Sequence, residues 1–291
     1  MTAAAMRAGF GQNDDVVLVP VTTAHLEGAL GLSQEMSWPY RVEDWEVALQ
    51  LGQGFVLQDG AGKIIGTAVW WPYGETHASA GMIIVAKAAQ GRGWGARLMD
   101  ALLAAARPRT ITLNSTAEGL VLYQRRGFVP IGVIQQHQGV LKERHEAPPT
   151  SRVRAMADSD FEAIARLDRQ ATGWERQTML GRLIAMGDGN VLLRDGVARG
   201  YAICRLFGRG HVIGPVVAES PDDARALIEA ALSRLGRVFV RVDTSATSQL
   251  GTWLERIGLQ QVGDATNMVL GTQAPSMGPV RMFALANQSF N

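Results

Sequence analysis

The sequence of 291 residues contains a single cysteine, Cys204. One thiol excludes a disulfide within the chain and any zinc or iron–sulfur site built on several cysteines. The 5 histidines are dispersed, and no two of them have the spacing of metal ligands. We therefore expect a protein without a metal site, in a reducing compartment such as the cytoplasm.

Long apolar runs are also missing, since none approaches the ~18 residues of a transmembrane helix. Residues 1–14 lack the apolar core of a signal peptide and predict a flexible N-terminal tail. Charge is balanced, with 28 Lys+Arg against 27 Asp+Glu. The basic residues are dispersed, so we expect neither nucleic acid nor a membrane as a partner.

With 291 residues, the chain is long enough for two domains of ordinary size. Hydrophobic residues make up 47% of it, which is ample for one or two packed cores. The segment 147–151 includes Pro148-Pro149 and is the best linker candidate. We therefore expect one domain over 15–146 and another over 152–291.

Hydrophobic spacing in the first half predicts alternating strands and helices. Leu26, Leu30 and Met36 recur at helical intervals, and Asp59-Gly60-Ala61-Gly62 suits a hairpin turn. Strands are predicted over 16–21, 54–58, 63–71, 80–85 and 110–113, and helices over 43–51, 96–106 and 119–126.

The second half repeats the first. Lys63–Ala68 matches Val197–Ala202, and Tyr123–Phe128 matches Leu254–Leu259 at nearly the same offset. Such a sustained register indicates two tandem copies of one α+β unit. Two copies could form a pseudo-dimer within one chain, so we expect a monomer or a homodimer.

A glycine run lies where a strand gives way to a helix, over Gln90-Gly91-Arg92-Gly93-Trp94-Gly95-Ala96. Glycines let successive backbone N–H groups turn inward, and the helix adds unpaired donors and the positive end of its dipole. Together these groups form an anion site suited to a pyrophosphate, to which Arg92 could add charge.

Two other interpretations of this run are a structural turn and a dinucleotide-binding G-x-G-x-x-A loop. The dinucleotide loop should follow the first strand of its domain and precede an acidic residue at the end of the next strand. Here about four strands precede the run, and the next strand ends in Asn114-Ser115. The pattern therefore disfavours a dinucleotide site.

Two motifs in order resemble those of the GCN5-related N-acetyltransferases (GNAT). The strand Ile83-Ile84-Val85 leads into the cradle Gln90–Gly95, and Tyr123 precedes Gly127-Phe128. The whole chain resembles a two-domain, tandem subgroup of this superfamily. The resemblance implies an α+β (three-layer α/β) fold, in which each half has a mixed, mostly antiparallel central sheet flanked by helices.

The resemblance also implies acetyl-CoA as cosubstrate and a direct attack by an amine. Tyr123 would protonate the departing thiolate, and Thr116 stands where the family often has asparagine. The expected contacts to acetyl-CoA are Ile83, Ile84, Val85, Gln90, Gly91, Arg92, Gly93, Trp94, Gly95, Ala96, Thr116 and Tyr123.

The acceptor site is expected near Trp38, Tyr40 and Trp45, in the region that lines it in the resembled family. Aromatic walls suit an apolar or cationic amine, although ordinary packing of a helix explains these residues equally well. No base is evident in the sequence. Glu35, Glu75 and His77 are candidates, and a chain of water molecules is an alternative.

The second copy reads Asp222-Asp223-Ala224-Arg225 at the cradle and Leu254 at the tyrosine position. Carboxylates there oppose a pyrophosphate, so we expect a degenerate domain that does not bind coenzyme A. Asp243 could cap a helix or contact substrate. The sequence thus predicts an N-acetyltransferase acting on a small-molecule amine, with a non-catalytic acyl-CoA-binding or sensor protein as the alternative.

Overall fold

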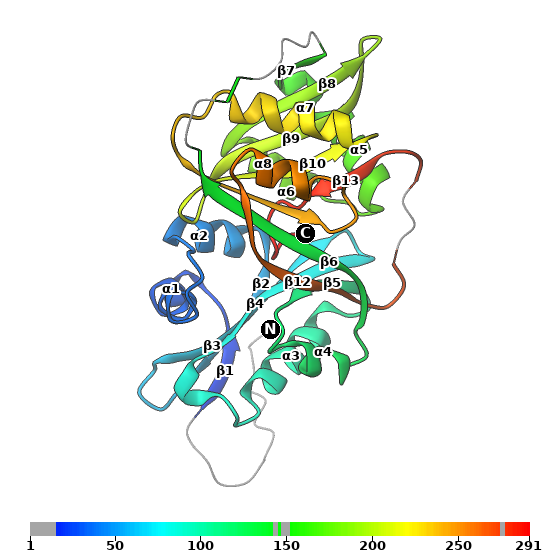
Figure 1. The fold of residues 1–291 in the computed structure, drawn as a ribbon. Coiled ribbons are helices and arrows are strands. Elements are labelled where there is room, and N and C mark those ends of the chain that lie inside the picture. Colours follow the sequence, from blue (N-terminus) through cyan, green and yellow to red (C-terminus); the bar gives the residue numbers. More distant parts are fainter. Residues whose placement is uncertain (1–15, 142–144, 147–151, 274–276) are drawn as a thin grey trace.

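The computed structural model describes residues 16–141, 145–146, 152–273 and 277–291. These residues form a mixed sheet of 13 strands flanked by helices (Figure 1). The tail expected over 1–14 and the linker expected over 147–151 lie outside the described residues. In the described part of the chain, no helix combines the length and the apolar character needed to cross a membrane.

The first half supplies five neighbouring strands at one side of the sheet, all antiparallel except for the parallel pair β4 and β5. The strands are β1 (Val17–Pro20), β2 (Gln53–Gln58), β3 (Ile64–Tyr73), β4 (His77–Val85) and β5 (Thr110–Ser115). The helices are α1 (Leu26–Glu35), α2 (Val42–Leu51), α3 (Trp94–Ala106) and α4 (Leu120–Gln124). Each element predicted in this half is present, with ends shifted by a few residues.

The second half repeats this order and adds a last short strand. Its strands are β7 (Val153–Ala155), β8 (Gly187–Arg194), β9 (Val197–Phe207), β10 (Gly210–Ala218), β11 (Phe239–Ser245), β12 (Gln260–Leu270) and β13 (Arg281–Ala284). Its helices are α5 (Phe161–Thr172), α6 (Gln177–Ile184), α7 (Pro221–Leu232) and α8 (Gly251–Arg256). The recurrence of strands and helices agrees with the tandem repeat in the sequence.

The two halves exchange a strand. β6 (Val129–Val140) pairs with β11 of the second half, whereas β12 pairs with β5 of the first half. β6 and β12 also pair with each other and cross the middle of the molecule as the green and orange strands of Figure 1. A division of the chain at residues 147–151 remains a proposal, and a cut there would not separate two self-contained sheets.

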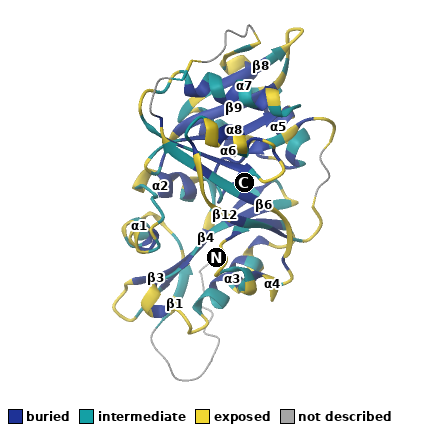
Figure 2. Cartoon of the chain, viewed as in Figure 1, coloured by how far each residue is buried: buried dark blue, intermediate teal, exposed yellow. Residues whose placement is uncertain are grey.

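A single apolar core runs across the junction of the halves. Trp71 and Leu98 of the first half belong to the same buried cluster as Leu167 and Tyr201 of the second. Figure 2 shows buried residues along the strands of both halves and exposed residues on the outer faces of the helices. Because burial of apolar area is the main stabilising term, this shared core fixes the relative position of the two halves.

A buried ion pair lies within this junction. The Arg176 guanidinium donates to both carboxylate oxygens of Asp168, at 2.9 and 2.6 Å, and Tyr201 also donates to that carboxylate. The two charged side chains are 0% and 1% exposed. Burial and the Asp168 charge raise the pKa of the Tyr201 hydroxyl, so this group stays a donor. The attraction between the two charges therefore offsets the free-energy cost of removing each of them from water.

We expect Asp168→Asn to lower the free energy of unfolding by about 3–5 kcal/mol, because it leaves the Arg176 charge buried and unpaired. Urea unfolding measures the change. The control is Glu175→Gln, which removes a pair with Arg169 that is 3.6 Å long and more than half exposed. That change should cost under about 1 kcal/mol. Equal small losses in both variants would contradict the stabilising role of the buried pair.

Candidate active site

The parallel strands β4 and β5 diverge near their middle. They pair from His77 and Thr110 to Ala80 and Leu113, and the pairing then stops. Beyond this point β4 bulges, with Met82 at a φ of +51°. The Thr67 hydroxyl donates to the Met82 carbonyl at 2.7 Å and holds the bulge in place. On the side of β5, the backbone groups of β4 after Ala80 therefore face a gap rather than a strand.

This gap is a cleft of about 600 Å³. Its walls come from the end of β4, the glycine run, the start of α3, the end of β5 and α4. The predicted residues that line it are Ile83, Ile84, Val85, Gln90, Gly91, Gly93, Trp94, Gly95, Thr116 and Tyr123. Two predicted residues, Arg92 and Ala96, lie outside the lining, and the Ala96 carbonyl accepts from Arg126 instead.

The glycine run forms an open cradle at the start of α3. Gly91 and Gly93 have φ values of +77° and +81°, a left-handed conformation that glycine adopts without strain. A Cβ atom at either position would meet no atom within 4 Å, so the space beside the backbone is free. Gln90 pins the loop by donating to the Val85 carbonyl at 3.0 Å. Free space beside the N–H groups of a helix start suits a diphosphate.

Tyr123 forms the side of the cleft that belongs to α4. Its ring packs edge-on against Phe128 at 5.9 Å, and the residue is only 7% exposed. Burial raises the pKa of the Tyr123 hydroxyl to about 12. The phenol is therefore protonated at neutral pH and is available as a proton donor.

A second cavity of about 170 Å³ adjoins the cleft. The two share Trp38, Gly81, Met82, Asn114 and Thr116 as lining residues, so they meet at the bulge of β4. The remaining walls include residues of the second half and of β6: Gln136, Phe207, Arg209, Arg241, Gln288 and Ser289. The second copy thus contributes directly to this cavity.

The three aromatic residues predicted at the acceptor site separate into two groups. Trp38 and Tyr40 line the second cavity, and the Tyr40 hydroxyl lies 2.9 Å from the Ser289 hydroxyl. Trp45 is 0% exposed and lines neither cavity, because its indole turns into the core and donates to Ser33 at 2.9 Å. Trp45 is thus an ordinary packing residue of α2.

The proposed bases do not lie in either cavity. The Glu35 carboxylate accepts from the Lys87 backbone at 2.7 Å, and Glu75 and His77 lie at the opposite end of β4 from the bulge. Among the described residues, Glu118 is the one carboxylate that lines the cleft, and hydrogen bonds lower its pKa. No three metal-ligating side chains come together in the described part of the chain.

The corresponding gap in the second half is filled by the chain itself. β10 and β11 pair in parallel only at His211–Val240 and Val212–Arg241. Beyond these pairs β13 runs antiparallel to both strands, so Ala284 pairs with Val216 and with Thr244. The start of α7, which corresponds to the glycine cradle before α3, is also occupied, because the Asp223 carboxylate there pairs with Arg194 at 3.1 Å. Among the described residues, β13 thus occupies the place in this copy that the cleft occupies in the first half.

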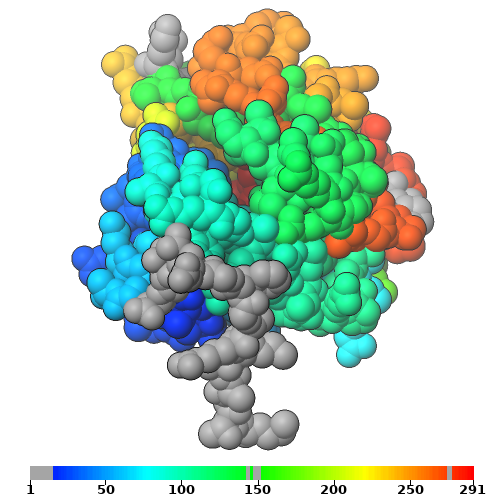
Figure 3. Space-filling view, turned by 90° about the horizontal axis from the view of Figure 1, so that it is seen from below, coloured from blue at the N-terminus to red at the C-terminus, as the bar shows by residue number. Residues whose placement is uncertain are grey.

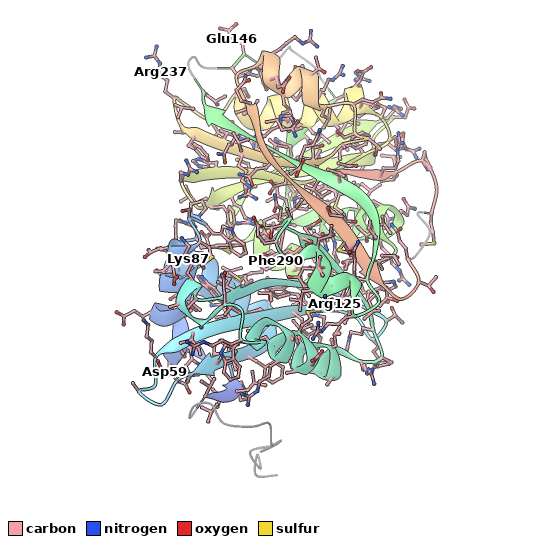
Figure 4. All side chains as sticks on the ribbon, turned by 60° about the horizontal axis from the view of Figure 1, so that its bottom comes forward. Asp59, Lys87, Arg125, Glu146, Arg237 and Phe290 are labelled. Atoms are coloured by element: carbon pink, nitrogen blue, oxygen red, sulfur yellow. The ribbon has the colours of Figure 1, made fainter. Side chains whose placement is uncertain are left out.

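The chain then continues from β13 into the first half. Ser289 packs against Gly81, where a Cβ atom would come within 3.0 Å of it. Phe290 stacks edge-on against Trp71 at 5.0 Å and lies near the centre of the molecule in Figure 4. In Figure 3, red atoms of this end of the chain lie inside a hollow between cyan and green atoms. Residues 288 and 289 thereby reach the second cavity.

Asp243 neither caps a helix nor lines either of these two cavities, since it accepts from Arg241 at 2.9 and 3.0 Å and is 0% exposed.

Several residues that line the second cavity were not predicted from the sequence. Arg209, Arg241, Gln288 and Ser289 reach the cavity only through the strand exchange and the last strand. No local pattern marks them.

Comparison with known proteins agrees with this architecture. Models of the acetyltransferase (GNAT) domain match residues 50–130 and 164–284, which together are more than half of the chain. The chain is 26% identical over 282 residues to YitH of Bacillus subtilis, an uncharacterised N-acetyltransferase, covering 94% of this chain and 99% of that protein. The holothin acyltransferase of a Pseudoalteromonas species is 23% identical and covers 79% of this chain and 82% of its own.

The fold is shared with a protein of Pyrococcus horikoshii of known crystal structure. The TM-score is 0.79 at 20% sequence identity, over 98% of this chain and 99% of that one. The chain therefore belongs to the GNAT acetyltransferases, a family of acyltransferase enzymes, and carries two GNAT domains in tandem.

We expect Gly93→Ala to weaken acetyl-CoA binding by roughly tenfold or more, about 1.4 kcal/mol, because the added methyl group occupies the cradle. Calorimetry measures the affinity. The matched control is Gly62→Ala in the β2–β3 turn, where φ is +80° and a Cβ atom also meets nothing within 4 Å. Both variants should lose about 1–2 kcal/mol of stability. Equal affinities in the two variants would refute the cradle.

Proposed function

We propose that the first half transfers an acetyl group from acetyl-CoA to a primary amine of a small molecule. The observation that carries this proposal is the divergence of β4 and β5, with a glycine cradle at one end of the gap and a small second cavity at the other. The cradle suits the diphosphate of coenzyme A, and the gap suits its pantetheine arm.

Backbone amides of Ile83–Val85 would hold the pantetheine arm, since this part of β4 has no strand partner on the side of β5. A backbone N–H in the same stretch would donate to the thioester carbonyl and stabilise the oxyanion that forms there. Acetyl-CoA, when bound, supplies the thioester. Trp94 and Thr116, which also line the cleft, would complete the binding site together with the glycine run.

The amine nitrogen attacks the thioester carbon and forms the new C–N bond. Collapse of the tetrahedral intermediate breaks the C–S bond, and the thiolate takes a proton from the Tyr123 hydroxyl. The amine loses a proton to water, because the described lining offers no carboxylate or imidazole near the bulge of β4. That proton returns to the phenolate through solvent, so Tyr123 is restored.

A small acceptor is favoured by the size of the second cavity. Its volume of about 170 Å³ is below the roughly 300–1,000 Å³ of pockets for drug-sized ligands. Its walls come from both halves, which restricts access by a folded protein. The relative from Pseudoalteromonas is named for acyl transfer to holothin, which supports a defined acceptor compound.

We further propose that the enzyme acts as a monomer or a homodimer in the cytoplasm, without a metal, nucleic acid or membrane partner. The exchanged strands already join two GNAT units within one chain. The lone thiol of Cys204 is buried and free, as suits a reducing compartment.

The rival function is that of a non-catalytic acyl-CoA-binding or sensor protein. One observation favours it, namely that no carboxylate or histidine lines the second cavity among the described residues. Release of free thiol from acetyl-CoA in the presence of an amine panel distinguishes the two. Sustained, amine-dependent release supports the enzyme, and tight binding without release supports the sensor.

We expect calorimetry to give one equivalent of acetyl-CoA per chain, because β13 fills the corresponding gap of the second half. The variant Asp223→Gly tests this point, since it restores at the start of α7 the glycine that matches Gly91, while β13 stays in place. Its stoichiometry should remain one. Two equivalents in either protein would contradict the degenerate second copy, and none would refute the proposed function.

Tyr123→Phe should lower kcat by roughly 100-fold through loss of the proton donor, while the affinity for acetyl-CoA changes little. A general acid acts while it is protonated and fails as the pH rises through its pKa, which is about 12 for Tyr123. The wild-type kcat should therefore show no loss from this group below about pH 10. A basic limb near pH 8 that Tyr123→Phe abolishes would contradict this role.

A further inference from the structure

The second cavity, of about 170 Å³ and here called the acceptor cavity, is lined by positive charge that the sequence did not predict. Two arginines of the second half, Arg209 and Arg241, line it, and no described carboxylate does. Arg209 follows the end of β9, and Arg241 lies on β11. Both belong to the second half and line the same cavity as Gly81 and Met82 at the bulge of β4.

Arg241 is held rigidly. Its Nε donates to both oxygens of Asp243, at 3.0 and 2.9 Å, and its side chain is 12% exposed. Gln288 donates to the same carboxylate at 3.3 Å. A guanidinium has five N–H donors, so this pairing leaves donors of a fixed group for a second acceptor. Asp243 thus orients Arg241 while its own side chain stays outside the cavity lining.

Arg209 is exposed, and its guanidinium stacks over Phe239 at 5.2 Å. Within the described part of the chain, no carboxylate lies at ion-pair distance from it. No described carboxylate therefore neutralises its positive charge. An unpaired guanidinium at the wall of a small cavity attracts an anion.

The groups behind the cavity add to the positive field. Arg205 is 3% exposed and donates to the Ala286 carbonyl at 3.0 Å, with no carboxylate at ion-pair distance among the described residues. The nearby carboxylate of Asp44 is already paired with Arg41 at 2.8 Å. A cationic tail on the acceptor would be repelled here, in contrast to the cationic amine that the aromatic residues suggested.

We propose that the acceptor is an amino carboxylate, whose carboxylate binds Arg209 and Arg241 while its amine lies at the bulge of β4. This inference rests on the proposed acetyl transfer and specifies its substrate class. Arg209 supplies the uncompensated charge, and Arg241 supplies fixed donors. Such charge-assisted hydrogen bonds are the stronger ones in proteins, so the acid group would determine both affinity and orientation.

The test uses a series of acceptors with equal chain lengths. Unbranched amino carboxylates with two to five carbons are compared with alkylamines and diamines of the same length, and with taurine and O-phosphoethanolamine as other anions. Thiol release gives kcat/KM, and calorimetry in the presence of coenzyme A gives binding without turnover. We expect a carboxylate to exceed its neutral partner by about tenfold or more, as for a hydrogen bond to a charged group.

Arg209→Gln should remove most of this preference, roughly tenfold, by raising KM for amino carboxylates much more than KM for alkylamines of the same length. The matched control is Arg281→Gln, since Arg281 is also exposed and stacks over Phe283 at 5.6 Å, but lines no part of the cavity. Arg241→Lys is the second variant, because it keeps a cation beside Asp243 and loses the planar fork of donors.

The outcomes separate the inference from the function on which it rests. Acetylation of alkylamines or diamines as efficiently as amino carboxylates overturns the inference and leaves the acetyltransferase intact. A preference for sulfonate or phosphate overturns the carboxylate assignment. Arg209-dependent binding of amino carboxylates without any thiol release supports the anion site and overturns the transfer reaction. Equal losses in Arg209→Gln and Arg281→Gln also refute it.

Discussion

A polar backbone that runs into the interior must find hydrogen-bond partners, and this constraint organises both halves of the molecule. In each half two parallel strands begin side by side and then diverge. In the second half the chain closes its own gap with β13, which bonds to both neighbours. In the first half the gap remains as a cleft, where a flexible arm bearing amides would complete the sheet. The same pair of diverging strands is therefore closed by β13 in the second half and left open in the first half.

The exchange of β6 and β12 has a direct effect on the site. Because β12 lies beside β5 and β6 lies beside β11, the second half is held against the open end of the β4–β5 gap. Arg241 on β11 and residues 288–289 after β13 thus become walls of the acceptor cavity. The buried pair of Arg176 and Asp168 lies in the same junction. If this cavity binds the acceptor as proposed, specificity for the acceptor is a property of the junction rather than of either copy.

The elements and the cradle were predictable because they depend on local sequence. Apolar periodicity located the strands and helices of the first half, and the glycines of the run are required by the left-handed conformation at Gly91 and Gly93. The contacts of Ile83–Val85 and Tyr123 with the cleft followed from family motifs whose spacing is kept. Arg92 and Ala96, within the same motif, do not line the cleft, and the motif alone does not distinguish them from their neighbours.

The acceptor side was not predictable, because it depends on contacts between distant parts of the chain. Trp38, Tyr40 and Trp45 look alike in sequence, yet only the first two border the cavity. β6 and β12 are similar strands at equivalent positions of the repeat, so their pattern does not reveal that β12 pairs with β5 and β6 with β11. Nothing local to Arg209 or Ser289 indicates a cavity that forms only when β13 is inserted.

The strand exchange also affects the order in which the chain can fold during synthesis. The edge of β5 is covered by residues 266–270, which leave the ribosome about 155 residues after residues 111–115. Until then the nascent first half exposes an open strand edge beside an apolar core, a surface that promotes aggregation. Such long-range pairing also slows folding. The sheet of the first half is therefore completed only late in translation, when the second half has supplied its strand.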